Sequence, residues 1–346
     1  MQPKVSIVIL NWNGLEDSSE CLRSVMDLEY DHREVILVDN GSSDGSVKAL
    51  RSLFPSITIM ENRENVGFAK ANNQAIEYAL EGGTDYIWLL NNDTVTLPDA
   101  LSRLVSAAES PEIGLASPLI YFHDSREKMQ FCGSVIDWEN QRIRHIESLE
   151  ELADVDPKEN LSLWGTALLM KRRTVIDVGY LNEKYFAYHE DEEYCLRIAR
   201  AGYRCIVVPE ARIFHKNSRS TGSNDAPMQV FLRSRNLFFL WMDTLRGVDR
   251  IRYVPKYLAH IVSYGGSLKG KNLPDSVEAC LDGVWNAFRG MGGPRNTNIA
   301  MPAPLRGLFR FLFSWHPYFW ASLFRADFAR IRSDLAKRAS ADRKAI

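Results

Sequence analysis

Asparagine and aspartate side chains follow three short apolar runs, and they are the first residues in the sequence whose types and positions could do chemistry. They are Asn11 and Asn13 after Val5–Leu10, Asp39 within Glu34–Asn40, and Asn91, Asn92 and Asp93 after Asp85–Leu90. A carboxylate such as Asp39 can accept the imide N–H of uracil or thymine, or bind a ribose hydroxyl. One polar residue after an apolar run is usually a turn or a helix cap, but three such ends favour a binding site.

The stretch Asp39–Ser46 (DNGSSDGS) also has the features of a tight turn before a helix. Gly41 and Gly45 allow a positive φ, and Asp44 is a good helix N-cap. Those roles leave Asp39 unexplained. The sequence contains neither G-x-G-x-x-G nor G-x-x-x-x-G-K-S/T, so it predicts no dinucleotide fingerprint and no Walker loop.

A second set of candidates, Glu190 and Asp191, comes directly after the aromatic stretch Tyr185–His189. Acidic residues in the first turn of a helix are stabilised by its dipole, which accounts for Glu192 and Glu193. Glu190 and Asp191 precede them, where the aromatic side chains could form the wall of a cleft. A carboxylate held there could act as a general base.

His215 ends the later apolar run ARIFH. A lone histidine is more often structural than a ligand. Paired with a carboxylate from a distant part of the chain, such as Asp93, it could complete a metal site. Mg²⁺ or Mn²⁺ would take mainly oxygen ligands, including phosphates, and tolerate one imidazole.

Short apolar runs alternate with helical patterns over the first ninety residues, and these elements must position the candidates. The runs are Val5–Leu10, Glu34–Asn40, Ser56–Met60 and Asp85–Leu90. Each is rich in β-branched residues and typical of a strand buried on both faces. Four alternations predict right-handed βαβ units and a parallel sheet. Ligands bind at the carboxyl ends of such strands, so the three polar ends should share one edge.

The remainder of the first 225 residues has a less regular pattern. Strands are expected at 113–122, within 131–146 and at 205–215, a strand leading into a short helix at 161–175, and a helix at 191–204. Residues 151–160 are expected to form a loop, and Thr94–Pro98 a turn with Pro98 near the first position of the next helix. Asn217–Pro227 is rich in polar and helix-breaking residues and is the best boundary signal.

Charge is distributed unevenly along the 346 residues, whose net charge is −2. Residues 1–225 contain 23 lysines and arginines against 36 aspartates and glutamates, whereas residues 226–346 contain 19 against 8. We therefore expect an α/β body at 1–225 and a basic, aromatic-rich helical region at 226–346. The basic region suggests an anionic membrane surface or nucleic acid as partner, and a merely solvated basic face is the alternative.

The five scattered cysteines form no C-x-x-C pair, which fits a reducing compartment and excludes an obvious zinc ribbon. No signal peptide is evident, and no apolar run approaches the ~18–20 residues of a membrane span. We expect a cytoplasmic protein with peripheral contact to the inner face of the cell membrane.

Seven blocks of the sequence, taken in order, resemble the family 2 inverting glycosyltransferases of GT-A fold. The resemblance covers roughly residues 3–225 and looks closest to the bacterial rhamnosyltransferase-like branch. The blocks are VSIVILNWNG, VILVDNGSSDGS, NVGFAKANNQAI, YIWLLNNDTV, GTALLMKRRTVIDVG, YHEDEEYCLR and FHKNS. The implied fold is a Rossmann-like mixed sheet, mainly parallel, flanked by helices, with a C-terminal helical extension.

The resemblance also implies a role for each matching residue. Those implied to bind the nucleotide sugar are Asn11, Asn13, Asp39 (at the pyrimidine), Asp44, Asn65, Gly67, Asn72, Asn92 (at the ribose or sugar) and Glu190. Asp93 and His215 would bind Mg²⁺ or Mn²⁺ and the diphosphate. Asp191 matches the catalytic base.

Two features depart from patterns seen in this family. The first acid of the Asp-x-Asp metal motif is Asn91 here, which leaves one carboxylate in the triplet. The Q-x-x-R-W motif of processive synthases is absent, and Arg233–Asn236 (RSRN) stands roughly at its place. We therefore expect one sugar per binding event.

The predicted function is inverting transfer of one sugar from dTDP-rhamnose or a UDP-hexose to a saccharide or polyprenyl-linked acceptor in cell-surface polysaccharide synthesis. A nucleotidyltransferase and a non-catalytic nucleotide-sugar-binding module are the alternatives. For the C-terminal region we expect membrane contact, not nucleic acid, with a dimer interface or ordinary core packing as alternatives.

Overall fold

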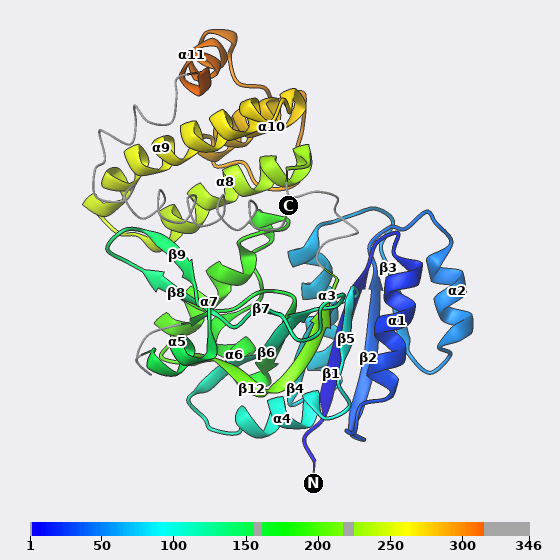
Figure 1. Ribbon diagram of the computed structural model, residues 1–346. Coiled ribbons are helices and arrows are strands. Elements are labelled where there is room, and N and C mark those ends of the chain that lie inside the picture. The colour runs from blue at the N-terminus through cyan, green and yellow to red at the C-terminus, as the bar shows by residue number, and fades with distance from the viewer. Residues whose placement is uncertain (1, 156–160, 217–224, 315–346) are drawn as a thin grey trace, which may run out of the picture.

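The computed structural model describes residues 2–155, 161–216 and 225–314 (Figure 1). The main strands are β1 (Val5–Asn11), β2 (Arg33–Asp39), β3 (Thr58–Glu61), β4 (Tyr86–Asn91), β5 (Thr94–Thr96), β6 (Ile113–Phe122), β7 (Met129–Phe131), β11 (Ala167–Lys171) and β12 (Arg204–His215). Over these described ranges they form a nine-stranded sheet in the order β3-β2-β1-β4-β11-β6-β12-β5, with β7 paired to β6. A small antiparallel sheet contains β8 (Ser134–Asp137), β9 (Arg142–His145) and β10 (Leu161–Ser162).

The strand directions confirm the predicted mixed, mainly parallel sheet. β2, β1 and β4 are neighbours and run parallel, and their register places Asn11 opposite Asp39 and Leu10 opposite Asn91. β11 runs antiparallel between β4 and β6, so β6 points the same way as β4, as does β12 beside it. The polar ends of β1, β2 and β4 therefore meet at one edge, as the sequence predicts.

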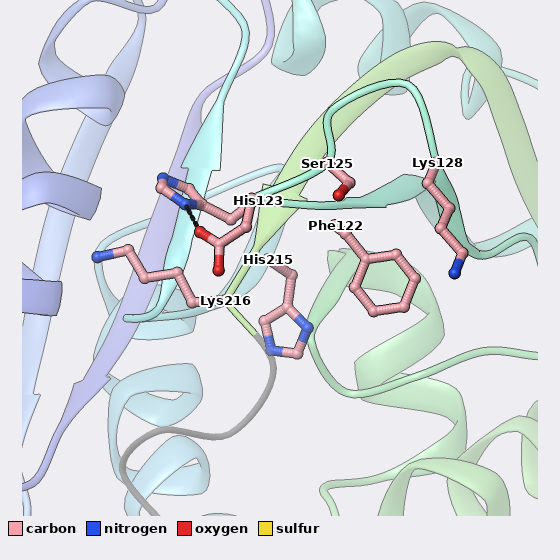
Figure 2. Close-up of a pocket in the computed structure, with 7 residues that line it drawn as sticks. Phe122, His123, Ser125, Lys128, His215 and Lys216 are labelled. Atoms are coloured by element: carbon pink, nitrogen blue, oxygen red, sulfur yellow. Dashed lines mark hydrogen bonds and ion pairs between the residues drawn. The ribbon is translucent and has the colours of Figure 1, made fainter. Parts of the chain in front are cut away.

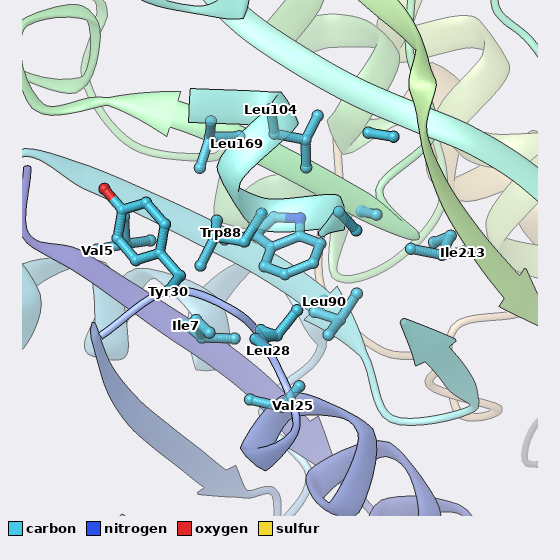
Figure 3. Packing of buried hydrophobic residues seen from close by; sticks show 14 of the residues in the cluster. Val5, Ile7, Val25, Leu28, Tyr30, Trp88, Leu90, Leu104, Leu169 and Ile213 are labelled. Atoms are coloured by element: carbon cyan, nitrogen blue, oxygen red, sulfur yellow. The ribbon is translucent and has the colours of Figure 1, made fainter. Parts of the chain in front are cut away.

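Helices cover both faces of the sheet (Figure 1). The helices of this part are α1 (Leu15–Met26), α2 (Ser46–Leu53), α3 (Phe68–Glu81), α4 (Ala100–Ala107), α5 (Leu149–Asp154), α6 (Arg172–Val178), the 3-10 turn η1 (Glu183–Tyr185) and α7 (Glu190–Arg200). Buried side chains of α1 and α4 pack on one face, and those of α3, α6 and α7 on the other. Figure 3 shows Trp88 of β4, fully buried, among Ile7, Leu90 and Leu104. Burial on both faces explains why these strands are apolar throughout.

The remaining described helices form a separate layer beside the α/β part (Figure 1). They are α8 (Pro227–Thr244), α9 (Val248–Gly270), α10 (Pro274–Phe288) and α11 (Ala303–Ser314). Phe231, Phe239 and Trp241 of α8 are buried in its core, which fits the core-packing alternative for this helix. The boundary loop 217–224 and residues 315–346 lie outside the described residues, so the division into 1–225 and 226–346 stays a prediction.

Two local predictions are wrong. The expected loop at 151–160 begins as helix α5, where the N–H of Glu151 donates to the Ser148 hydroxyl at 3.1 Å; residues 156–160 lie outside the described residues. The expected turn at Thr94–Pro98 begins as strand β5, because Thr94 pairs with His215 of β12. Pro98 precedes α4 by two residues rather than opening it.

None of the described helices is both long enough and apolar enough to span a membrane.

Candidate active site

A buried hydrogen-bond network joins the carboxyl ends of β1 and β2. The Asn11 amide donates to Asp39 Oδ1 at 3.1 Å and to the hydroxyls of Ser42 and Ser46 at 3.1 and 2.9 Å. Asp39 Oδ2 accepts the backbone N–H of Ser42 at 3.0 Å. Asn11 and Asp39 are at most 2% exposed. The network fixes the orientation of the Asp39 carboxylate, which is what recognition of a planar base requires.

The loop after β1 is tied to the loop after β2. The backbone N–H of Asn13 donates to the Ser42 hydroxyl at 2.8 Å, and the Asn13 side chain accepts the N–H of Ser43 at 2.8 Å. Asn13 itself has a φ of 50°. Asp44 is exposed and accepts the N–H of Ser46, the first residue of α2, at 3.0 Å. The Ser46 hydroxyl belongs to the Asn11–Asp39 network, so Asp44 joins that network only through Ser46; Gly45 directly precedes this helix.

A third loop, after β3, joins the same edge through Asn40. Its side chain donates to Asn65 Oδ1 at 3.0 Å and accepts the N–H of Val66 at 3.0 Å. Gly67 has a φ of 91°, and a Cβ there would lie 2.5 Å from the Phe186 ring, so only glycine fits. Asn72 donates to Phe68 O within its own helix at 2.9 Å. Asn65 and Gly67 thus lie together beside Asn40, whereas the described contact of Asn72 is local.

The Asn91-Asn92-Asp93 triplet is linked to this network through Asn92. Its amide donates to the Ser18 hydroxyl at 2.9 Å, and Ser18 donates to Asn11 Oδ1 at 2.6 Å. Gly14 lies against Asn92, because a Cβ there would be 2.7 Å from the Asn92 amide nitrogen. The backbone at Gly14 can approach the Asn92 amide this closely because glycine has no Cβ.

Asp93 and His215 meet although 122 positions separate them in the chain. His215 Nε2 lies 3.3 Å from Asp93 Oδ1, and both residues are buried. His215 Nδ1 lies 2.8 Å from Gln130 Oε1. When Nδ1 donates this hydrogen bond, the Nε2 lone pair is the one that faces Asp93. His215 Nε2 and Asp93 Oδ1 can both donate a lone pair to a metal, so their proximity fits a divalent cation site. Among the described residues, this pair included, no three His, Cys, Asp or Glu side chains converge as a metal site.

A cavity of about 160 Å³ lies beside His215. Figure 2 shows the His215 ring between Lys216 and Phe122. The other lining residues come from the turn between β6 and β7: His123, Asp124, Ser125 and Lys128. Lys216 forms ion pairs with Asp17 and Glu20 of α1, which brings that helix to the same edge.

Asp191 lies close to the end of β4. Its Oδ2 accepts the N–H of Gly165 at 2.7 Å, and the neighbouring Thr166 carbonyl accepts the N–H of Asn91 at 2.9 Å. Burial raises the pKa of Asp191 to about 6, and the Glu192 carboxylate adds to the shift. A carboxylate with this pKa is ionised at neutral pH and is a stronger base than an exposed aspartate.

Glu190, directly before Asp191, has a different environment. It is 4% exposed, and its Oε2 has no hydrogen-bond partner within the described part of the chain. Burial raises the pKa of Glu190 well above its usual range, and Asp191 adds to this. On the other side of Glu190, the His189 ring contacts the Glu192 carboxylate. Burial alone would lower the pKa of His189, but the negative charge of Glu192 raises it above its ordinary value. Burial thus raises the pKa of both adjacent carboxyls, and Asp191 is the one whose Oδ2 accepts a backbone N–H, from Gly165.

Several residues that build the site were missed by sequence reasoning. They are Ser18, Asn40, Ser42, Gln130 and Gly165. Asn40 and Ser42 lie within the stretch Asp39–Ser46. Serine and asparagine are common in turns, so their presence there did not indicate a binding role. Gln130 and Gly165 carry no local signal, because their partners lie 85 and 26 positions away.

The arrangement combines four chemical elements at one sheet edge. These are the hydrogen-bonded carboxylate of Asp39 on β2, the asparagine amides at the ends of β1 and β4, the Asp93–His215 pair, and the Asp191 carboxylate with a pKa of about 6. Together they can bind a base and a diphosphate and accept a proton from a hydroxyl.

Comparisons with known proteins agree with this arrangement. Residues 6–176 match the family model for Glycosyl transferase family 2. The chain is 28% identical over 215 residues to an N-acetylglucosaminyl-diphospho-decaprenol L-rhamnosyltransferase of Mycobacterium tuberculosis, covering 56% of this chain and 69% of the relative. It is 22% identical over 247 residues to a dTDP-rhamnosyl transferase of Shigella flexneri, covering 69% of this chain and 80% of that one.

A solved structure shows the same fold. The mannosyltransferase of Pyrobaculum calidifontis, in complex with GDP-Man and Mn²⁺, has a TM-score of 0.53 and 18% identity over 93% of this chain and 84% of the other. This likeness confirms the predicted GT-A fold, and the two rhamnosyltransferase relatives confirm the resemblance to that branch. Residues 6–176 form a glycosyl transferase family 2 domain, and the chain is a glycosyltransferase that uses a nucleotide-sugar donor.

Proposed function

We propose that this glycosyltransferase transfers one sugar per binding event, with inversion, to a hydroxyl of a saccharide or lipid-linked acceptor in cell-surface polysaccharide synthesis. dTDP-rhamnose is the first candidate donor and a UDP-hexose the second. The observation that carries the proposal is the proximity of Asp191 to the end of β4, where Asn92 and Asp93 stand. The names of the two rhamnosyltransferase relatives support the donor and the lipid-linked acceptor.

Donor recognition is assigned to the network at β1 and β2. Asp39, held by Asn11 and the N–H of Ser42, accepts the imide N–H of the pyrimidine. At the same ring position cytosine has a lone pair instead of an N–H, so a carboxylate facing that nitrogen favours thymine or uracil. Asn92, which is linked to this network through Ser18, is assigned to the ribose or the sugar. The roles of Asn13, Asp44, Asn65, Gly67, Asn72 and Glu190 at the donor stay predictions.

Asp191 is assigned as the general base. The acceptor hydroxyl oxygen forms a bond to the anomeric carbon while the bond from that carbon to the diphosphate oxygen breaks. The hydroxyl proton passes to Asp191, and the nucleoside diphosphate leaves with the electron pair. Attack from the face opposite the leaving group inverts the configuration. General base catalysis contributes roughly 10²–10⁴-fold to such a step.

Asp93 and His215 are assigned to a Mg²⁺ or Mn²⁺ ion. When bound, the ion would supply positive charge that stabilises the leaving diphosphate. The single carboxylate of the triplet and one imidazole make a sparse protein ligand set, because Asn91 stands at the other acidic position. Diphosphate oxygens, together with water, would supply the remaining ligands, so metal and donor should bind together.

The C-terminal helical layer is assigned a peripheral membrane contact that brings the enzyme to a lipid-linked acceptor. Leu305 and Leu308 of α11 are 42% and 51% exposed, on a helix that also carries Arg306 and Arg310. Both arginines pair with Glu278 or Asp282 of α10, so the attraction to an anionic membrane surface is assigned to the excess of basic residues over the whole of 226–346, and the exposed leucines would enter the interface.

A donor screen tests the reaction. The purified chain is incubated with dTDP-rhamnose or UDP-hexoses, with MgCl₂ or MnCl₂, and release of nucleoside diphosphate is measured with and without EDTA. We expect release with a pyrimidine-linked sugar, its loss with EDTA, and an inverted anomeric centre by NMR. Pyrophosphate release from a nucleoside triphosphate would favour the nucleotidyltransferase instead, and binding without turnover would favour the binding module.

A further inference from the structure

The loop before Asp191 has an unusual backbone. Within Tyr185–His189, three non-glycine residues have positive φ: Phe186 at 67°, Tyr188 at 69° and His189 at 69°. L-residues rarely adopt this region, and each such residue persists only where surrounding contacts hold it. The loop leads directly into α7, whose second residue is Asp191. The position of the base therefore depends on whatever holds this loop.

Asn236 of α8 makes the densest set of contacts to the loop. Its amide nitrogen lies 2.9 Å from the carbonyl oxygen of Tyr185 and 2.8 Å from those of Ala187 and Tyr188. Asn236 is fully buried. An amide has two hydrogens, so three carbonyls of a single loop share the donors of one side chain.

Arg235 sets the direction of that amide. Its Nε donates to Asn236 Oδ1 at 2.8 Å, which turns the Asn236 nitrogen toward the loop. Its Nη2 donates to Tyr185 O at 2.9 Å, and its Nη1 donates to Gly293 O. Arg235 is fully buried, and no carboxylate is among these partners. Burying a guanidinium without a carboxylate partner is costly, so its hydrogen bonds to these backbone carbonyls must hold it in place. The contact between Arg235 and the loop is therefore specific.

The opposite side of the loop faces the donor-binding edge. Phe186 O accepts the N–H of Ala69 at 3.2 Å, and the Phe186 ring packs on Gly67. The loop is thus held between α3 on one side and α8 on the other. Loss of the α8 contacts would release the part of the loop next to Asp191, whereas Phe186 stays held at the start of α3 by Ala69 and Gly67.

We propose that Arg235 and Asn236 are positioning residues that hold Tyr185–His189 so that Asp191 faces the acceptor hydroxyl. The proposal rests on the proposed role of Asp191 as base. It gives the RSRN segment a task distinct from substrate contact, and it makes the C-terminal helical layer part of the catalytic apparatus.

The test compares Asn236→Ala with a matched variant, Asn286→Ala. Asn286 of α10 is also buried, but its amide donates to Asp282 O in its own helix at 2.8 Å. With dTDP-rhamnose and Mn²⁺, or the UDP-hexose that the donor screen selects, we expect Asn236→Ala to lower kcat on the order of 10–100-fold. A misplacement of about 1 Å can cost this much. Affinity for the nucleoside diphosphate, measured by calorimetry, should stay close to wild type.

A pH profile separates positioning from general destabilisation. Releasing the loop hydrates Asp191, so the acid limb of kcat should move to lower pH in Asn236→Ala and stay in place in Asn286→Ala. Hydrogen exchange of residues 185–189 should quicken only in the former. Wild-type kcat and an unmoved acid limb in folded Asn236→Ala overturn the proposal, as does lost activity without faster loop exchange.

A second variant decides the outcome if Asn236→Ala does not fold. Asn236→Asp keeps the size and the Arg235 contact but turns a carboxylate, without donors, toward three carbonyls. It should show the same loss of kcat and faster loop exchange. Asp191→Asn separates the proposed base from the proposed positioning role. If Asp191→Asn stays active, the assignment of Asp191 as base is wrong. If it is inactive while both Asn236 variants behave as wild type, only the positioning role is wrong.

Discussion

At the residue scale, neighbouring carboxyl groups have opposite tasks because their partners differ. Glu190 and Asp191 are adjacent, yet Asp191 accepts N–H groups from Gly165 and Glu192, whereas Glu190 has a buried oxygen without a partner among the described residues. Hydrogen bonds to an ionised carboxylate stabilise it, and burial without them favours the protonated form. This difference supports the proposal that Asp191, rather than Glu190, is the base.

Replacing Asp191 by asparagine tests the base directly. Asp191→Asn should lower kcat roughly 10²–10⁴-fold, on the order of 3–5 kcal/mol of barrier, because the amide accepts no proton. Nucleoside diphosphate release measures the loss. Asp177→Asn, an exposed carboxyl paired with Arg173, is the control and should retain activity. Near-normal turnover of Asp191→Asn would assign the base elsewhere.

The pH dependence of the wild-type enzyme follows from the same carboxyl. The base acts only when ionised, and burial raises the pKa of Asp191 to about 6. Activity should therefore rise with pH through about 6 and be lost below it. An ordinary exposed aspartate would place this limb near ~4. A limb near 4, measured at saturating donor, would contradict the buried-base assignment.

Metal affinity should depend on the ring orientation of His215. Gln130→Leu removes the partner of Nδ1, and loss of such an orienting group typically weakens metal binding about 10–100-fold. The Mn²⁺ concentration for half-maximal activity should rise accordingly, and His215→Ala should raise it at least as much. His32→Gln, an exposed histidine bonded to Gln2 O, is the control. An unchanged Mn²⁺ requirement in both variants would exclude this pair as the metal site.

At the element scale, α7 joins a structural and a functional role within one turn. Glu193 is buried and accepts Arg197 Nε at 2.8 and 3.0 Å, and Arg197 also donates to the carbonyls of Val178 and Tyr180. These contacts anchor the helix to the segment after α6. The anchored helix then presents Asp191 from its first turn.

Removing the Arg197 side chain should therefore destabilise the fold. Arg197→Ala leaves the Glu193 carboxylate buried and unpaired, and we expect a loss of about 3 kcal/mol in the free energy of unfolding. Arg173→Ala breaks another i,i+4 pair, but Arg173 is 77% exposed, so the loss should stay below about 1 kcal/mol. Urea denaturation of both variants makes the comparison, and equal losses would show that the buried pair has no special weight.

At the scale of the whole molecule, an acidic α/β part adjoins a basic helical region. The site lies on the acidic part, and the exposed Leu305 and Leu308 lie on α11 of the basic region. The proposed membrane contact therefore involves the basic region and not the acidic part that carries the site. The contact of α8 with the loop Tyr185–His189 joins the two parts directly.

Vesicle binding tests the membrane assignment. The chain should cosediment with vesicles containing phosphatidylglycerol at low salt and dissociate at high salt, because screening weakens the attraction of basic residues. Leu308→Asp should reduce binding. Leu53→Asp is the matched control, since Leu53 is equally exposed, at 55%, but lies on α2 of the acidic part. Equal binding to phosphatidylcholine vesicles, or no effect of Leu308→Asp, would contradict the assignment.

Most of the sheet could be predicted, since its evidence is local. Four apolar, β-branched runs predict β1 to β4 within a few residues, and parallel order then places their polar ends together. Helix α5 also had a local signal, because Ser148 followed by Glu151 is a capping pattern, and that signal was overlooked. Strand β5 had none: Thr94–Thr96 is extended because β12, some 120 positions later, lies beside it.

The sequence by itself determined the family, the strands and the residue types at the sheet edge. Only the tertiary structure decided how those residues act. It brought His215 to Asp93, aimed Asp39 through Asn11, buried Asp191 enough to move its pKa, and placed Asn236 against the loop before it. Residue type and strand order follow from periodicity along the chain, whereas burial, hydrogen-bond partners and ring orientation depend on contacts between segments that no local pattern encodes.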